Sequence, residues 1–170
     1  SNLLVKLACL TIRDDKSDEV SKEDQEFMIL ESRFLEKPAF AVEQGRNAAR
    51  HMERDSRKAL DISLGLLRNY EEEQAERVQK IETKVDRYED ELGTYLVKLN
   101  NKDLSEKDSH SVSIMLHCIG DFERISDHAV NIMESARELH EKNLSFSPEA
   151  RTELQVLASV VGRIVDTAYD

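Results

Sequence analysis

Long uncharged stretches are missing from this sequence of 170 residues. The longest run without Asp, Glu, Lys or Arg extends only from Ser109 to Gly120. A helix that crosses a bilayer needs roughly 18 or more apolar residues, so this chain does not cross a membrane. It also lacks a signal-peptide pattern and an initiator Met. Because Ser1 and Asn2 resemble a cleavage scar, we expect the chain to be a piece of a longer protein.

Turn-forming and aromatic residues are scarce, with five Gly, two Pro and no Trp. This scarcity, together with 35% charged residues, is typical of a protein built from long helices. Cys9 and Cys118 belong to no metal-ligand or redox motif, which favours buried thiols in a reducing compartment. The net charge of −11 argues against nucleic acid as a partner, because a phosphate backbone needs a basic surface.

Apolar periodicity predicts an all-α fold, an antiparallel helical bundle. Four long helices are expected, at about residues 38–69, 72–99, 105–142 and 147–170. The second has a heptad seam from Val78 to Leu99, and Ser105 and Ser147 are the expected N-caps of the last two.

The segments before these helices differ from one another in character. Residues 3–12 are short and apolar, and residues 13–26 are charged without periodicity, which predicts a loop. The pattern of residues 27–35 predicts a short helical turn or an extended segment.

The last predicted helix is strongly apolar along one side, from Leu154 to Val165. We expect a partner to cover this side, and hence self-association through the C-terminal helix.

Two pairs of carboxylates stand out, Glu82 with Asp86 and Glu123 with Asp127. Residues four apart on a helix point the same way, so each pair crowds two like charges onto one strip. If Ile81 and Phe122 hold the same heptad position, the pairs occupy equivalent edges of neighbouring helices, where they could hold a cation. Carboxylates favour hard or borderline ions such as Mg²⁺, Mn²⁺ or iron. A chain with 35 acidic residues also produces such pairs by chance.

Catalytic motifs are absent from the sequence. No Glu-x-x-His occurs, which disfavours a ferritin-type di-iron core. No Gly-rich phosphate loop and no G-x-S-x-G occurs either, so we expect no enzyme. A carboxylate-bridged metallohydrolase is the weakest alternative.

Residues 120–132, Gly-Asp-Phe-Glu-Arg-Ile-Ser-Asp-His-Ala-Val-Asn-Ile, resemble the signature of PhoU-type helical domains, (D/E)-L-E-R-I-G-D-x-A-x-N-I. The segment from Glu82 to Asp86 is similar to the other acidic motif of that family, D/E-x-x-x-D. Ser126 replaces the usual Gly, a small change on a helix. Three further parts of the chain resemble the cytoplasmic tail of bacterial sodium/phosphate cotransporter proteins: residues 4–12, 34–44 and 95–105.

The resemblance implies a three-helix repeat whose two acidic motifs bind metal in some members. It then places a membrane-proximal segment and linker at residues 1–36, one repeat at 37–143, and the first helix of a second, truncated repeat at 144–170. Glu82, Asp86, Glu123 and Asp127 are the implied ligands, for Mg, Mn, Fe or Zn ions.

By this resemblance the chain is the cytoplasmic regulatory domain of a sodium-dependent phosphate transporter, acting on its own membrane portion. Two alternatives stay open: a free-standing phosphate-signalling regulator of PhoU type, and a metal-free helical oligomerisation module.

Overall fold

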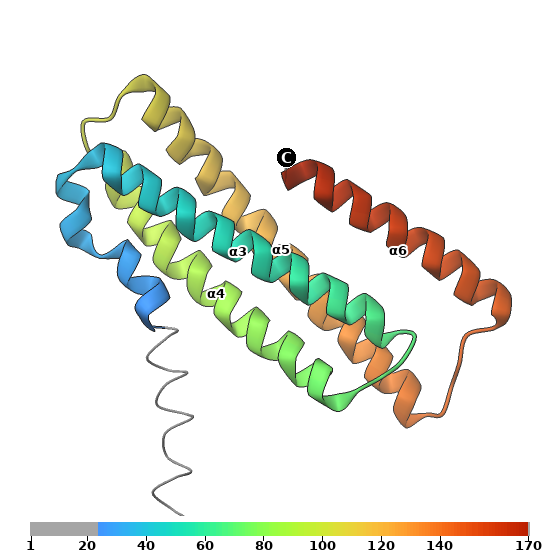
Figure 1. Ribbon diagram of the computed structural model, residues 1–170. Helices are drawn as coiled ribbons and strands as arrows, with labels where there is room; N and C mark the ends of the chain where they lie inside the picture. The colour runs from blue at the N-terminus through green and yellow to red at the C-terminus, as the bar shows by residue number, and fades with distance from the viewer. Residues whose placement is uncertain (1–23, 170) are drawn as a thin grey trace, which may run out of the picture.

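The computed structural model describes residues 24–169, and all the regular secondary structure in this part of the chain is helical. Figure 1 shows the long helices running up and down beside one another. After a helical turn at residues 24–27, the elements are η1 (Met28–Leu30), η2 (Ser32–Glu36), α3 (Pro38–Leu66), α4 (Glu72–Asn100), α5 (Glu106–Glu141) and α6 (Pro148–Tyr169). The predicted all-α class is confirmed. The apolar segment at residues 3–12 and Cys9 lie outside the described residues.

Local sequence signals account for the helix ends. Pro38 opens α3, where its missing N–H costs nothing. Ser105 caps α5, because its Oγ accepts a hydrogen bond from the Asp108 N–H at 3.1 Å. The Ser147 Oγ accepts one from Ala150 at 3.2 Å in the same way. Both predicted caps are therefore confirmed.

Two other helix ends are set by backbone hydrogen bonds. The predicted first helix reached residue 69, but α3 ends at Leu66, where the Arg68 N–H turns back to the Gly65 carbonyl. Helix α5 ends because Asn143 adopts a left-handed backbone conformation with φ of 53°. That conformation lets the Leu144 N–H reach the Leu139 carbonyl at 2.9 Å.

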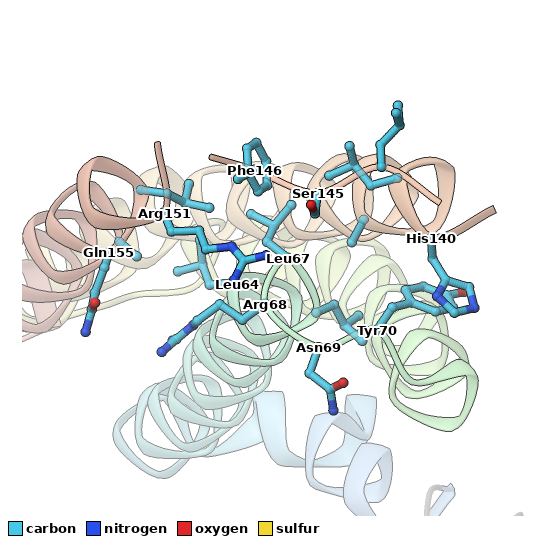
Figure 2. Close-up of a pocket in the computed structure, with 16 residues that line it drawn as sticks. Leu64, Leu67, Arg68, Asn69, Tyr70, His140, Ser145, Phe146, Arg151 and Gln155 are labelled. Carbon is cyan, nitrogen blue, oxygen red and sulfur yellow. The ribbon is translucent and has the colours of Figure 1, made fainter. Parts of the chain in front are cut away.

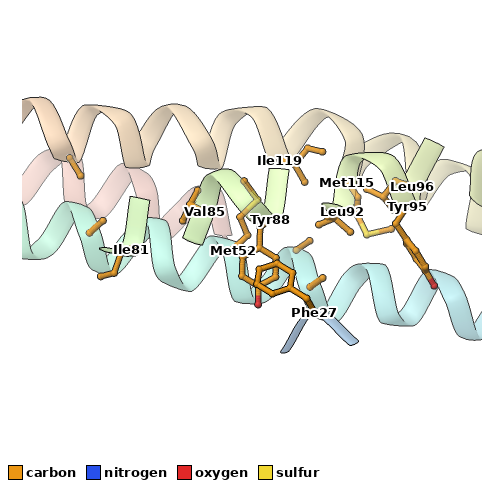
Figure 3. Close-up of a cluster of buried hydrophobic side chains, with 14 of the residues drawn as sticks. Phe27, Met52, Ile81, Val85, Tyr88, Leu92, Tyr95, Leu96, Met115 and Ile119 are labelled. Atoms are coloured by element: carbon orange, nitrogen blue, oxygen red, sulfur yellow. The ribbon is translucent and has the colours of Figure 1, made fainter. Parts of the chain in front are cut away.

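The core lies between α3, α4 and α5, as Figure 3 shows. Helix α4 contributes its whole predicted heptad seam, in which all seven residues are buried: Val78, Ile81, Val85, Tyr88, Leu92, Tyr95 and Leu99. Helix α3 contributes mainly small residues, including Ala41, Ala48 and Ala59, none of which is exposed to solvent. Small side chains on α3 let the other two helices approach it closely.

The closest such approach is at Gly45. A Cβ atom placed there would lie 3.1 Å from Leu96 Cδ2 and 3.6 Å from Met115 Cε. Leu96 is fully buried and has little room to move. Gly120, in the middle of α5, would meet no atom within 4 Å.

An N-terminal arm, residues 24–36, lies against α3 and α4. Phe27 is buried against the Tyr88 ring, with 4.4 Å between ring centroids. The Lys84 ammonium joins the arm to the bundle, because it pairs with Glu26 at 2.6 Å and with Asp55 of α3 at 2.9 Å. Residues 27–35 thus form helical turns rather than an extended segment.

Helix α6 lies against the bundle less intimately than the other three. Val161 and Val165 pack on the core, and Arg57 of α3 donates a hydrogen bond to the Gly162 carbonyl at 2.9 Å. Leu157 and Ile164 are about three-fifths exposed, at 60% and 63%. The expected uncovered apolar side is present, and self-association through it stays a prediction that sedimentation can test.

None of the helices within residues 24–169 has both the length and the apolar character that a bilayer crossing requires.

Replacing Gly45 with Ala is expected to leave the protein about 1–2 kcal/mol less stable than replacing Gly120 with Ala. Each change gains helix propensity, but only the Cβ at position 45 crowds the buried Leu96 and Met115. Urea unfolding of the two variants measures the difference. Equal stabilisation by both would contradict the close packing described for Gly45.

Candidate metal centre

The packing of α4 and α5 places four acidic side chains along the seam between them. Ile81 and Val85 are buried, so Glu82 and Asp86, the next residues along α4, lie at the rim of the core. On α5, Ser126 is buried and Asp127 follows it at the rim. The two predicted acidic strips therefore border the same seam.

Three of the four predicted ligands come together there. One oxygen each of Glu82, Asp86 and Asp127 lies within 4.8 Å of the others. Glu82 is half-buried, while Asp86 and Asp127 are exposed. This arrangement of oxygen atoms from two helices could hold a metal ion.

Glu123 is not a member of that group of three, although it is close enough to interact with it. Burial raises the pKa of Glu123, and the neighbouring Asp127 carboxylate raises it further. Glu89 and Asp86 of α4 add to the same effect. Glu123 therefore lies at the edge of the cluster.

The direction of the two helices decides which of these acids meet. Helices α4 and α5 run antiparallel, so residue numbers rise along one helix where they fall along the other (Figure 1). Glu82 and Asp86 therefore both lie near Asp127, and Glu123 lies toward Glu89.

No ion pair within residues 24–169 involves any of these four carboxylates. The two nearby arginines bind other acids: Arg87 pairs with Glu91 at 2.7 Å and with Asp24, and Arg124 pairs with Asp121. A neutral donor, the Gln79 side-chain amide, bonds to Glu82 at 2.7 Å. The negative charge of the cluster is thus not balanced by any basic side chain of residues 24–169.

The pKa values of Glu82 and Asp86 are raised in this setting. Burial raises the pKa of Glu82, and the charges of Asp86 and Asp127 raise it further. Burial likewise raises the pKa of Asp86, with added contributions from Asp127 and Asp90. Each raised pKa means that the folded protein disfavours the charged form of the carboxylate. A bound cation would favour the charged form again.

The donor set fits a hard divalent ion better than a soft one. All three grouped ligands are carboxylates, which suit Mg²⁺, Mn²⁺ and Fe²⁺. Three protein ligands leave positions for water, as is usual for Mg²⁺. Structural zinc sites favour Cys and His ligands, and the group contains neither.

Two features of the region were missed by the sequence analysis. Glu89 faces Glu123 across the seam, which only the register between helices reveals. Ser126 is fully buried, and its Oγ has no hydrogen-bond partner among the described residues. Because a buried unsatisfied hydroxyl costs about 1–3 kcal/mol, the replacement of the usual Gly by Ser is not a small change.

Replacing Asp86 with Asn is expected to raise the stability of the metal-free protein at neutral pH by a few tenths of a kcal/mol. The pKa of Asp86 is higher in the folded state, so repulsion destabilises the fold above that pKa and is relieved as the pH falls through it. The gain should therefore vanish below the ordinary Asp value of 3.8. Denaturant unfolding at several pH values measures it. A stability loss at neutral pH would instead show that the Asp86 charge is stabilising.

Comparison with known proteins identifies the family. A family model described as PhoU domain matches residues 49–136, slightly more than half of the chain. Searches of curated proteins and of solved structures give no match. The matched range contains all four predicted ligands and the whole of α4. With its helical bundle, its paired acidic motifs and this match, the chain belongs to the PhoU domain family.

Proposed function

We propose that this chain is a phosphate-signalling regulatory domain of PhoU type that binds a divalent cation through Glu82, Asp86 and Asp127, with Glu123 beside them. PhoU domains are a regulatory family without catalytic activity. The observation that carries the proposal is the meeting of three carboxylates from two helices inside the matched range, with no basic partner in the described chain.

A cation at this position would stabilise one arrangement of α4 and α5. Its charge would stabilise the charged carboxylates of Glu82, Asp86 and Glu123, whose pKa values are raised by burial and by their mutual repulsion. Glu82 and Asp86 come from α4 and Asp127 from α5, so the ion would connect the two helices. Ion occupancy would thereby change the rigidity of the surface that a regulatory domain presents to its partners.

Mn²⁺ binding tests the cation site. The wild-type protein is expected to bind Mn²⁺ and to unfold at a higher temperature in its presence, whereas the double variant Asp86→Asn/Asp127→Asn should lose both properties. Calorimetric titration and thermal unfolding measure them.

A matched control for this test is Glu134→Gln/Glu153→Gln. These residues are exposed, make no described ion pair and change the net charge equally. Equal Mn²⁺ binding by the wild type and by both double variants would refute the site.

The regulatory role requires a cellular test. In the source organism, the Asp86→Asn/Asp127→Asn variant is expected to alter phosphate uptake when phosphate is plentiful, as measured with radiolabelled phosphate. The control Glu134→Gln/Glu153→Gln should behave as the wild type. Uptake that is identical in all three strains would argue for a metal-free oligomerisation module instead.

A narrower proposal is that the chain is the cytoplasmic regulatory part of a sodium-dependent phosphate transporter. It rests on the resemblance of residues 34–44 and 95–105 to the tails of such proteins, and the family match gives it no separate support. The same resemblance supports a three-helix repeat at 37–143 and a second repeat opening with α6. Finding the complete gene product in the soluble fraction of the cell would favour the free-standing regulator.

A further inference from the structure

A cavity of about 530 Å³ lies at one end of the bundle, away from the acidic cluster. It is enclosed by the end of α3 and the link to α4, the last turns of α5, the α5–α6 link and the start of α6 (Figure 2). Pockets for small organic ligands typically measure about 300–1,000 Å³. The cavity has the size of a ligand site.

Its lining differs from the rest of this acidic protein. None of the described residues around the cavity is Asp or Glu, although the chain has 35 of them. Apolar side chains form one part of the wall, with leucines from α3, α5 and α6 and the Phe146 ring of the link. Polar side chains form the rest, among them two arginines, Arg68 and Arg151, and one histidine, His140.

Arg68 and Arg151 border the cavity from different parts of the fold. Arg68 follows the end of α3, and Arg151 lies in the first turn of α6. Figure 2 shows the Arg151 side chain reaching toward the labelled Leu67 and Arg68. Neither guanidinium makes a hydrogen bond or an ion pair with any described residue. Two like charges thus border one cavity.

One wall of the cavity is held rigid by its own contacts. The Tyr70 hydroxyl donates to Glu72 at 2.8 Å and accepts from the Arg137 Nε at 3.0 Å. Its ring stacks on His140, with 4.8 Å between centroids. An apolar ligand body would meet this wall already in place, so that little ordering cost would oppose binding.

We propose that this cavity binds an organic anion: one carboxylate or phosphate group on an apolar body. The anionic group would bind Arg68 and Arg151, whose planar guanidinium groups match carboxylate and phosphate oxygens. The apolar body would cover the leucines and Phe146. A neutral apolar molecule would leave both arginines without an anionic partner. Inorganic phosphate would leave the apolar side chains of the wall exposed to water.

Such a ligand would also connect α6 to the three-helix bundle. Arg68 belongs to the α3–α4 link and Arg151 to α6, so an anion between them would join parts that otherwise share few contacts. Ligand binding would thereby fix the exposed apolar side of α6 relative to the bundle. The inference is independent of the cation site and does not rest on the proposed function.

Fluorescence of anilinonaphthalene sulfonate, an aromatic anion, tests the site on the 170-residue chain. Saturable binding of one molecule per chain is expected. Decanoate and decyl phosphate should displace the dye. Decanol should do so at least about tenfold less well because it loses the charge-assisted hydrogen bonds to both arginines, and inorganic phosphate should do so at least about tenfold less well because it buries no apolar surface. Equal displacement by decanol, or by inorganic phosphate, would overturn the proposal.

Substitutions in the cavity wall test whether the dye and decanoate bind there. Arg68→Gln/Arg151→Gln should weaken dye and decanoate binding about tenfold or more, and Gln155→Glu should weaken it by placing a carboxylate in the wall. All three residues are exposed, so circular dichroism should show unchanged folding. Arg163→Gln is the control, since it removes a charge from α6 next to Ile164 and outside this cavity. Equal weakening in the control, or unchanged binding in the double variant, would refute the site.

Discussion

Burial of the apolar seam of α4 against α3 and α5 determines where every other feature of the molecule lies. The seam contains Tyr88 and Leu92, both fully buried, and it fixes the rotation of α4 about its axis. Residues that follow the seam by one position then lie at the rim, as Glu82 and Asp86 do. A rotation of α4 by one residue, about 100°, would remove these carboxylates from α5 altogether.

The same seam holds the acidic cluster together against its own repulsion. Each carboxylate pair contributes a few tenths of a kcal/mol of repulsion, whereas burying one large apolar side chain contributes about 1.5–3 kcal/mol. The core therefore tolerates the cluster. The pKa values of Glu82, Asp86 and Glu123 are raised by burial first and by the neighbouring carboxylates second. The packing of α4 against α5 thus brings three carboxylates close to one another.

The periphery is held by different forces. The N-terminal arm binds through the buried Phe27 and through Lys84, which joins two acids of different segments. Helix α6 makes fewer core contacts, and its outer apolar side stays exposed. Its looser attachment leaves space between its first turn and the end of α3, and this space is the cavity that Arg68 and Arg151 border.

Helix positions, both serine caps, the α4 seam and the two acidic strips were all determined by the sequence itself, because each depends on residues within a few positions of one another. The family signature at residues 120–132 is equally local. The tertiary structure alone decided that Asp86 meets Asp127, that Glu123 lies beside Glu89, and that Arg87 and Arg124 bind acids outside the cluster. It also brought together the cavity walls, from segments as far apart as residues 64 and 158. These outcomes depend on the direction and the axial offset of one helix against another, which result from the packing of the whole core and leave no periodic trace in any single segment.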